Sequence, residues 1–302
     1  MTVLKIDWKR LFSRKEEKRP VEKAIVLPEG GPFALSEDGK RLTFGRYPQS
    51  LCLVEKDLIT VKPNDDGYLS VIGDGTNVVF SVAETSFLSE IGKNVEKGDK
   101  YPYKFEPIEW EILSFDEKEA LLLSAKILDA KPYNDLDATR DGNRKDAYGY
   151  SVRLAMSDQA NIPANNWEVS TLREWLNWDF PATCFNEDEL GRVLTMDACE
   201  SIIKGETYAD QASILDVLTA QDESLGFLPS CEKDEKRRAE ATDFAMSSGL
   251  AERDGRYGVW WVKDGGFTTY NAARVYHDGY LNETGKKVDC VFGVRPLIKV
   301  KL

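Results

Sequence analysis

The sequence of 302 residues contains a single histidine, His277, and this scarcity excludes metal sites that need several imidazoles. Zinc and non-haem iron sites built from several imidazoles need more histidines than this chain has. A Ser–His–Asp site would have to use His277, but no Gly-x-Ser-x-Gly motif exposes a nucleophilic serine. His277 itself lies in a Tyr-His-Asp-Gly sequence that is typical of a turn. We therefore predict no catalytic residue and no metal site.

Motifs for nucleotides and membranes are also missing. The chain has no Gly-x-x-x-x-Gly-Lys-Ser/Thr loop and no Gly-x-Gly-x-x-Gly after a strand, so we predict no nucleotide and no other cofactor. No apolar run approaches the roughly 20 residues needed to span a bilayer, which excludes an integral membrane protein. The N-terminus lacks the apolar segment and cleavage site of a signal peptide, so we expect a cytoplasmic location.

The cysteine content and the net charge disfavour two further classes, disulfide-bonded proteins and nucleic-acid-binding proteins. The five cysteines are scattered, odd in number and never spaced as Cys-x-x-Cys, which favours reduced thiols over a disulfide framework; they are Cys52, Cys184, Cys199, Cys231 and Cys290. The net charge of −12 disfavours a nucleic-acid partner, because binding phosphates requires clustered Lys and Arg.

The basic residues that are present concentrate at the N-terminus. Residues 1–23 contain eight Lys or Arg against four acidic residues, a net charge of +4. Four apolar residues share one helical face there: Leu4, Trp8, Leu11 and Phe12. We interpret residues 1–33 as a basic leader and linker; residues 1–19 could dock on an acidic membrane surface or on a partner, or could be a solvated arm.

The stretch from Trp167 to Phe180 contains three of the seven tryptophans and predicts a helix seated on the core. Thr171 and Glu174 have the spacing of a capping box, and Pro181 should end the helix. One helical face carries large apolar side chains, and we assign structural roles to Trp167, Leu172, Arg173, Trp175 and Leu176.

The rest of the chain reads mainly as strands. Alternating and apolar patterns predict strands in 41–50 and 51–54, a hairpin from 107–115 and 120–124 that contains Trp110, and several strands after residue 258. Residues 64–104 could be an inserted β lobe within a single domain spanning 34–302. Asn186 and Glu189 predict a second capping box, and 231–249 a surface helix. The long polar segment between Pro132 and Asn166 is a candidate binding loop, with a loose calcium site as one possibility.

Six blocks of sequence occur in an order that resembles an uncharacterised bacterial domain family. They are FGRYPQ (44–49), PIEWEIL (107–113), ALLLSAKILDAKPYN (120–134), WEVSTLREWLN (167–177), WW (260–261) and GVRPLI (293–298). That family is distantly similar to formylglycine-generating (sulfatase-modifying) enzymes and to the C-type-lectin-like fold. The resemblance implies an α+β fold in which few helices pack on twisted antiparallel sheets with much irregular loop.

This sequence differs from the family pattern at two places, so it need not bind the same ligand as these relatives. The sequence after the tryptophans is Val-Lys-Asp-Gly-Gly where the family pattern has Arg-Ser-Pro, and the segment 132–166 differs in length. The oxidase chemistry of formylglycine-generating enzymes needs a cysteine pair near the C-terminal block, where this chain has only Cys290. We interpret Arg295 in GVRP as a buried guanidinium that ties the terminal strand to carbonyl groups or a carboxylate.

A candidate ligand face remains in the C-terminal region. Flat aromatic rings and fixed polar groups of the kind that bind a sugar or a peptide occur together at Trp260, Trp261, Lys263, Asp264, Tyr270, Asn271, Arg274 and Tyr276. The alternative is that the two tryptophans alternate between the core and a neighbouring loop.

Three functional hypotheses follow. The first is a non-enzymatic domain that binds a glycan or peptide through this face. The second is an enzyme with a site of carboxylates and Cys290, and the third is a structural or membrane-associated assembly protein that docks through its N-terminal helix.

Overall fold

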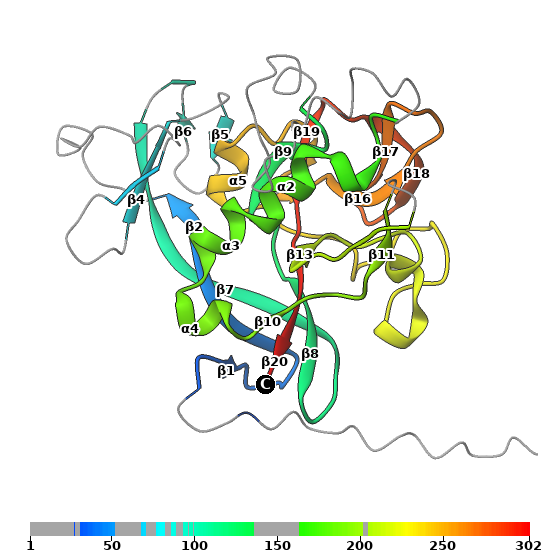
Figure 1. Ribbon diagram of the computed structural model, residues 1–302. Coiled ribbons are helices and arrows are strands. Elements are labelled where there is room, and N and C mark those ends of the chain that lie inside the picture. The colour runs from blue at the N-terminus through cyan, green and yellow to red at the C-terminus, as the bar shows by residue number, and fades with distance from the viewer. Residues whose placement is uncertain are drawn as a thin grey trace, which may run out of the picture.

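The computed structural model describes residue 27 and residues 31–51, 68–70, 77–81, 86–88, 93–95, 97–98, 100–135, 163–201 and 205–302 (Figure 1). Most of the predicted leader, the strand expected at 52–54 and the possible calcium loop lie outside these residues. Among the described helices, none has the length and apolar character needed to cross a membrane.

The larger of two main sheets has nine strands, and its principal path runs β1–β2–β7–β8–β20–β10. The bounds on this path are Ala34–Leu35 for β1, Arg41–Leu51 for β2, Lys100–Phe115 for β7, Glu119–Ser124 for β8, Leu297–Lys301 for β20 and Val193–Leu194 for β10. Three further strands join it: β4 (Asn77–Ser81) pairs with β7 and β3 (Tyr68–Ser70), and β13 (Ala212–Ser213) pairs with β20.

The smaller sheet has five strands in the order β18–β17–β16–β19–β9. Their bounds are Leu281–Lys287 for β18, Asn271–Val275 for β17, Trp260–Gly265 for β16, Val291–Val294 for β19 and Asp129–Pro132 for β9. β16 and β19 pair in parallel, whereas the other neighbours in this sheet are antiparallel. Three two-stranded ribbons complete the described strands: β5 (Ser86–Leu88) with β6 (Lys93–Val95), β11 (Cys199–Glu200) with β12 (Thr207–Tyr208), and β14 (Arg253–Asp254) with β15 (Tyr257–Gly258).

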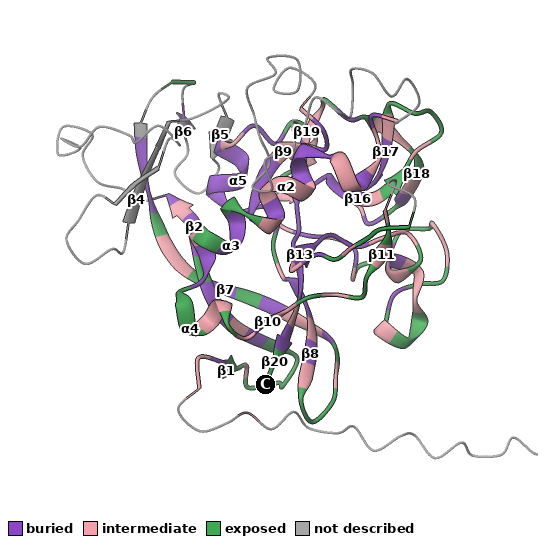
Figure 2. Ribbon diagram, viewed as in Figure 1, coloured by how far each residue is buried: buried purple, intermediate pink, exposed green. Residues whose placement is uncertain are grey.

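The described helices are short. They are α2 (Thr171–Asn177), α3 (Asp179–Cys184), α4 (Glu187–Leu190) and α5 (Asp243–Ser247), with 3₁₀ turns η4 (Trp167–Val169), η5 (Thr219–Gln221) and η6 (Glu223–Leu225). Of these, α2, α3 and α5 contact strands of the main sheets. α5 contacts β2 of the larger sheet and β9 of the smaller one, and its five residues are all buried (Figure 2). The protein is therefore α+β and rich in antiparallel sheet, as the sequence predicts.

The hairpin predicted from 107–115 and 120–124 is confirmed as β7 and β8. Ile108 and Trp110 are fully buried while Glu109 between them is exposed, so the alternation of apolar and polar residues reports the two faces of the strand. The Trp110 indole N–H donates to the Phe44 carbonyl of β2 at 2.7 Å. β7 begins earlier than predicted because its first residues pair with β4.

The helix predicted over Thr171–Phe180 is divided in two. Its N-cap is Ser170, whose hydroxyl accepts from the Arg173 backbone N–H at 3.1 Å, one residue before the predicted cap. Winding breaks at Trp178, and Pro181 lies in the first turn of α3, where its missing N–H removes no helical hydrogen bond. The prediction that Pro181 ends the helix is wrong.

Two other helix predictions have mixed outcomes. The capping box of Asn186 and Glu189 is present, although the helix that follows has only four residues. The surface helix predicted over 231–249 is wrong, because only Asp243–Ser247 is helical and it is buried. The preceding turns instead surround the buried Arg237, whose guanidinium donates to the carbonyls of Gly279, Ala220, Leu228 and Glu232.

Candidate functional site

The two tryptophans of the predicted ligand face are fully buried. The indole N–H of Trp260 donates to the Arg237 carbonyl at 3.0 Å, and that of Trp261 donates to the Lys131 carbonyl at 2.9 Å. Both belong to β16, the middle strand of the smaller sheet, whose first three residues are all buried. The expectation that these rings are presented to a ligand is therefore wrong. The alternative fits the structure, because Trp260 lies against the turn that contains Arg237, whereas Trp261 packs on Tyr133 and Phe292.

The other six residues of that predicted face lie in different surroundings. Arg274 is buried, pairs with Glu252 at 3.1 Å and donates to the Tyr276 hydroxyl at 2.8 Å. Tyr270 is 57% exposed in the β16–β17 turn, and Asn271 begins β17. Only Tyr270 thus presents a largely exposed ring.

Lys263 and Asp264 contact different parts of the chain. The Lys263 ammonium lies 4.0 Å from the Asp210 carboxylate and above the Trp167 ring. The Asp264 carboxylate accepts from the Val217 backbone N–H at 2.6 Å, and its partial burial raises its pKa above the ordinary value. The structure does not bring the eight predicted residues together on one surface.

A buried carboxylate that sequence analysis missed, Asp210, organises one flank of α2. It accepts hydrogen bonds from the Trp167 indole at 2.8 Å and from Nε of Arg173 at 2.6 Å. Asn177 closes the same flank, because its Oδ1 accepts from the Gln211 N–H at 2.8 Å. The polar residues of the WEVSTLREWLN block thus hold α2 against residues 210–212.

Arg295 is buried beneath the larger sheet. Its guanidinium donates to the Ser124 carbonyl at 2.8 Å and the Lys236 carbonyl at 3.2 Å, and lies 3.3 Å from Glu111. These contacts join β20, β8 and β7 at one point.

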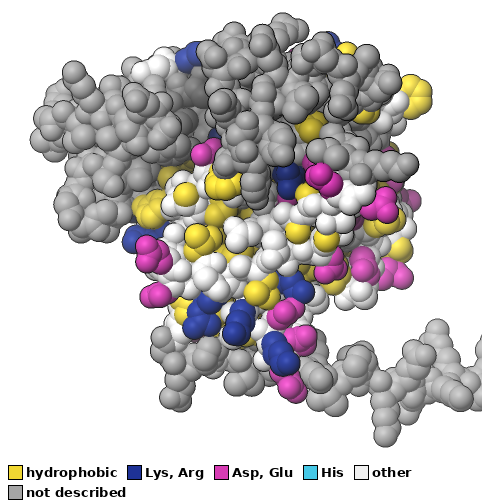
Figure 3. All heavy atoms as spheres, in the orientation of Figure 1, with side chains coloured by type: hydrophobic (Ala, Val, Ile, Leu, Met, Phe, Trp, Pro, Cys, Tyr) yellow, Lys and Arg dark blue, Asp and Glu magenta, His cyan; other side chains and the backbone are white. Residues whose placement is uncertain are grey.

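The opposite flank of α2 borders a cavity of about 220 Å³, which we call the α2 cavity. Its lining comes from β9, α2, the start of α3 and the ends of α5 and β19: Ala130, Lys131, Pro132, Asp135, Thr171, Leu172, Glu174, Trp175, Asp179, Ser248 and Val291. The Lys131 ammonium lies 4.6 Å from the centre of the Trp175 ring and 3.4 Å from the buried Asp129 carboxylate. Three other carboxylates, those of Asp135, Glu174 and Asp179, belong to its walls. In the space-filling view, hydrophobic side chains are visible around α2 and α3 (Figure 3).

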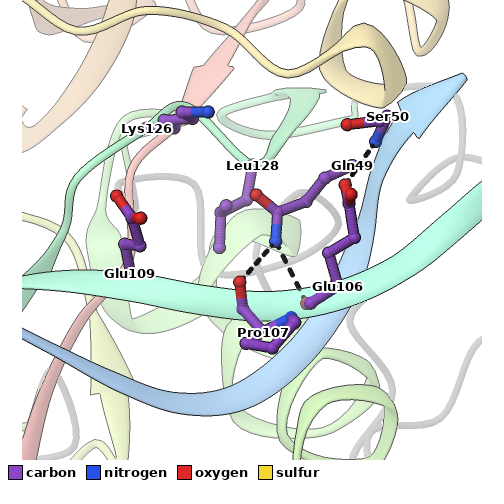
Figure 4. A pocket seen from close by; sticks show the side chains of 7 residues that line it. All are labelled: Gln49, Ser50, Glu106, Pro107, Glu109, Lys126 and Leu128. Atoms are coloured by element: carbon purple, nitrogen blue, oxygen red, sulfur yellow. Dashed lines mark hydrogen bonds between the residues drawn. The ribbon is translucent and has the colours of Figure 1, made fainter. Parts of the chain in front are cut away.

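A second cavity, of about 200 Å³, lies between β2, β7 and the segment after β8, and we call it the β2–β7 cavity (Figure 4). It is lined by Gln49, Ser50, Glu106, Pro107, Glu109, Lys126 and Leu128. The first three sequence blocks meet at this cavity. The first block supplies Gln49, the second Pro107 and Glu109, and the third Lys126 and Leu128. This meeting could not be predicted from the sequence, because only the pairing of distant strands brings the blocks together.

Neither cavity is lined by a cysteine. The four cysteines in the described part of the chain are free, and burial raises the pKa of the thiols of Cys184, Cys231 and Cys290, which disfavours the reactive thiolate. Within the same residues, no three His, Cys, Asp or Glu side chains converge on a position that could hold a metal ion.

Comparison with known proteins identifies a family for this chain. Neither the curated proteins nor the solved structures gave a match. Residues 118–302, more than half of the chain, match a family whose role is uncharacterised, and four of the six sequence blocks fall within this range. The chain therefore belongs to the family described as domain of unknown function (DUF6273).

Proposed function

We propose that this protein is a non-enzymatic recognition domain that binds a peptide through one basic side chain, held in the α2 cavity. The observation that carries the proposal is the lining of this cavity, which combines an aromatic ring, an apolar floor and three carboxylates. Such a combination suits a cation on an apolar stem, because the carboxylates attract the charge while the ring and the floor contact the methylene groups.

The charge of the lining supports a cationic ligand. Lys131 is the one cation among the described lining residues, and its ammonium already interacts with Asp129 and Trp175. Asp129 also accepts from the Tyr47 hydroxyl at 2.6 Å and is 1% exposed, so this ion pair is part of the cavity wall. Among the described lining residues the three carboxylates of Asp135, Glu174 and Asp179 thus outnumber the one ammonium, which favours a cationic group over an anionic one.

The size of the cavity supports a single side chain as the bound group. About 220 Å³ is below the roughly 300–1,000 Å³ of pockets that enclose drug-sized molecules. Ala130, Leu172 and Val291 supply the apolar contacts that a lysine or arginine stem would make.

Binding of blocked amino acids to the full chain tests the proposal. We expect N-acetyl-lysine amide and N-acetyl-arginine amide to bind in calorimetric titrations more tightly than the norleucine and glutamine equivalents. Glu174→Gln and Asp179→Asn should each weaken binding about twofold to fivefold, because each removes one attracting charge near the surface. Added salt should weaken binding further.

Asp188→Asn is the matched control, because it removes the same charge from the exposed face of α4. Equal binding of the norleucine compound, or an equal effect of Asp188→Asn and Asp179→Asn, would show that the cavity does not recognise a cation.

We also propose a bacterial cytoplasmic location and a distant relation to the C-type-lectin-like and formylglycine-enzyme folds. Four free cysteines support the location, since a reducing compartment keeps thiols unpaired. The sheet-rich α+β architecture supports the relation only at the level of fold class.

A further inference from the structure

Gln49 is a buried polar residue whose orientation is determined by its neighbours. It is 8% exposed, and its Nε2 donates to the carbonyls of Glu106 at 3.0 Å and Pro107 at 2.9 Å. Rotating the amide by half a turn would place its oxygen against these two carbonyl oxygens. The nitrogen therefore faces β7, and the oxygen faces the β2–β7 cavity (Figure 4).

The Gln49 oxygen accepts no hydrogen bond from the residues that the structure describes, and it is not one of the fully buried unpaired polar atoms, so it is open to solvent through the cavity. Because this oxygen is an acceptor that opens on the cavity, it can accept a hydrogen bond from the N–H or O–H group of a ligand in place of water. The backbone irregularity of β2 between Pro48 and Leu51 positions Gln49 in this way.

Other polar groups surround this oxygen. Glu106 accepts from the Ser50 backbone N–H at 3.0 Å through one carboxylate oxygen, and Glu109 and Lys126 form the far side of the cavity (Figure 4). The Lys126 ammonium is in no ion pair with the described residues, whereas Glu109 lies 3.4 Å from Arg41. Pro107 and Leu128 add apolar surface.

The formal charges at this cavity are largely offset. Among its lining residues Glu106 and Glu109 are negative and Lys126 is positive, and Glu109 also pairs with Arg41 outside the lining. A charged ligand would therefore gain little from the overall field. The acceptors of Gln49 and Glu109 require donors, while the Lys126 ammonium requires an acceptor. A hydroxyl group supplies both without adding charge.

We propose that the β2–β7 cavity binds a small, neutral, hydroxyl-rich molecule of the size of one sugar residue. Hydroxyl protons would reach the Gln49 oxygen and the Glu109 carboxylate, and a hydroxyl oxygen would accept from Lys126. The C–H groups of the ring would contact Pro107 and Leu128. This chemistry fits both a free monosaccharide and the terminal residue of a glycan.

Titration of the full chain with neutral monosaccharides, observed by ligand-detected NMR, tests this assignment. We expect at least one to bind in the millimolar range, and zwitterionic amino acids of similar volume to bind more weakly. Comparing a free sugar with its methyl glycoside separates the two sources. A site for the terminal residue of a glycan should bind both compounds, whereas a site for a free monosaccharide should bind the methyl glycoside more weakly.

Two substitutions make the test specific to the cavity. Lys126→Met removes the donor from an exposed side chain and should weaken binding about threefold to tenfold. Lys118→Met, in the β7–β8 turn, makes the same change away from the cavity and should have no effect. Gln49→Met should abolish binding, and its circular dichroism will show whether it folds.

Failure of every neutral sugar to bind would overturn the assignment, as would equal effects of Lys126→Met and Lys118→Met. Tighter binding of the amino acids would also overturn it. The two cavities share no lining residue, so this outcome is independent of peptide binding at the α2 cavity.

Discussion

The indole N–H of Trp167 donates a 2.8 Å hydrogen bond to the carboxylate of Asp210, which is 3% exposed. The same carboxylate accepts from Arg173 and lies near the Lys263 ammonium. One buried acid therefore fixes the tryptophan before α2, an arginine within α2 and a lysine of β16. Its loss should affect the region where the two sheets meet.

Asp210→Ala should lower the free energy of unfolding by about 3–5 kcal/mol, because it leaves the largely buried charge of Arg173 without its carboxylate. Asp210→Asn should cost less, since an amide oxygen can still accept one of the hydrogen bonds. Urea denaturation measures both. Asp197→Ala, at an exposed acid on the same segment, is the control and should change little; an equal loss there would refute this role for Asp210.

Gly279 has a backbone φ of +82°, and an added Cβ would collide with the backbone carbonyl of Asp234. Gly255 also has positive φ, +58°, but open space around it. Gly255→Ala should lower the free energy of unfolding by about 1–2 kcal/mol through backbone strain alone. Gly279→Ala should lower it by at least about 3 kcal/mol, because backbone strain and steric overlap combine. Thermal unfolding of the two variants compares them directly, and equal costs would contradict the close packing of this turn.

Asp264 should make the fold less stable as pH rises. Its pKa in the folded protein is raised, mainly by burial and also by the neighbouring charge of Asp216, although the Val217 hydrogen bond and Lys263 oppose this. The folded state thus holds the proton more tightly than the unfolded state, and stability falls as pH rises above the ordinary Asp pKa of about 3.9.

Asp264→Asn removes this dependence while keeping an oxygen for the Val217 N–H. The free energy of unfolding of the variant, relative to that of the natural chain, should rise by up to about 1 kcal/mol from about pH 3 to neutral pH. The effect is small because the residue is exposed. Urea midpoints at both pH values measure it. A variant that loses stability toward neutral pH would reverse the assigned sign.

Cys290 should react slowly with alkylating reagents. Burial and the adjacent Asp289 raise the pKa of its thiol, so little thiolate is present near pH 8. Iodoacetamide should label Cys290 at least about threefold more slowly in the folded chain than in urea, as measured by mass spectrometry of the peptides. Labelling as fast as in the unfolded chain would indicate an activated thiol and would favour an enzyme with Cys290 in its site.

Short-range patterns predicted the main hairpin and one capping box correctly. The β7–β8 hairpin follows from alternation in Pro107–Phe115, a turn and an apolar run, all of which are properties of neighbouring residues. The capping box of Asn186 and Glu189 is likewise local, since both hydrogen bonds form within four residues. The sheet-rich α+β class follows from the sum of such elements.

The positions of the predicted ligand residues depended on contacts between distant parts of the chain. Trp260 and Trp261 have the composition of an aromatic binding face, but β16 lies in the middle of a sheet whose two faces are covered by residues around Arg237 and around Tyr133. No sequence spacing records that coverage. For the same reason Asp210, an acid without a recognisable motif, was missed.

The sequence by itself determined the composition limits, the main hairpin and the match of residues 118–302 to the family, because these depend on residue types and their order along the chain. Tertiary structure alone decided which aromatic rings are buried, where the α2 helix breaks and which blocks meet around a cavity. Gln49 and Lys126 lie far apart in the chain and become neighbours only because β2, β7 and β8 pair side by side. Pairing of distant strands is set by burial of the whole core, and a pattern read along the chain does not contain it.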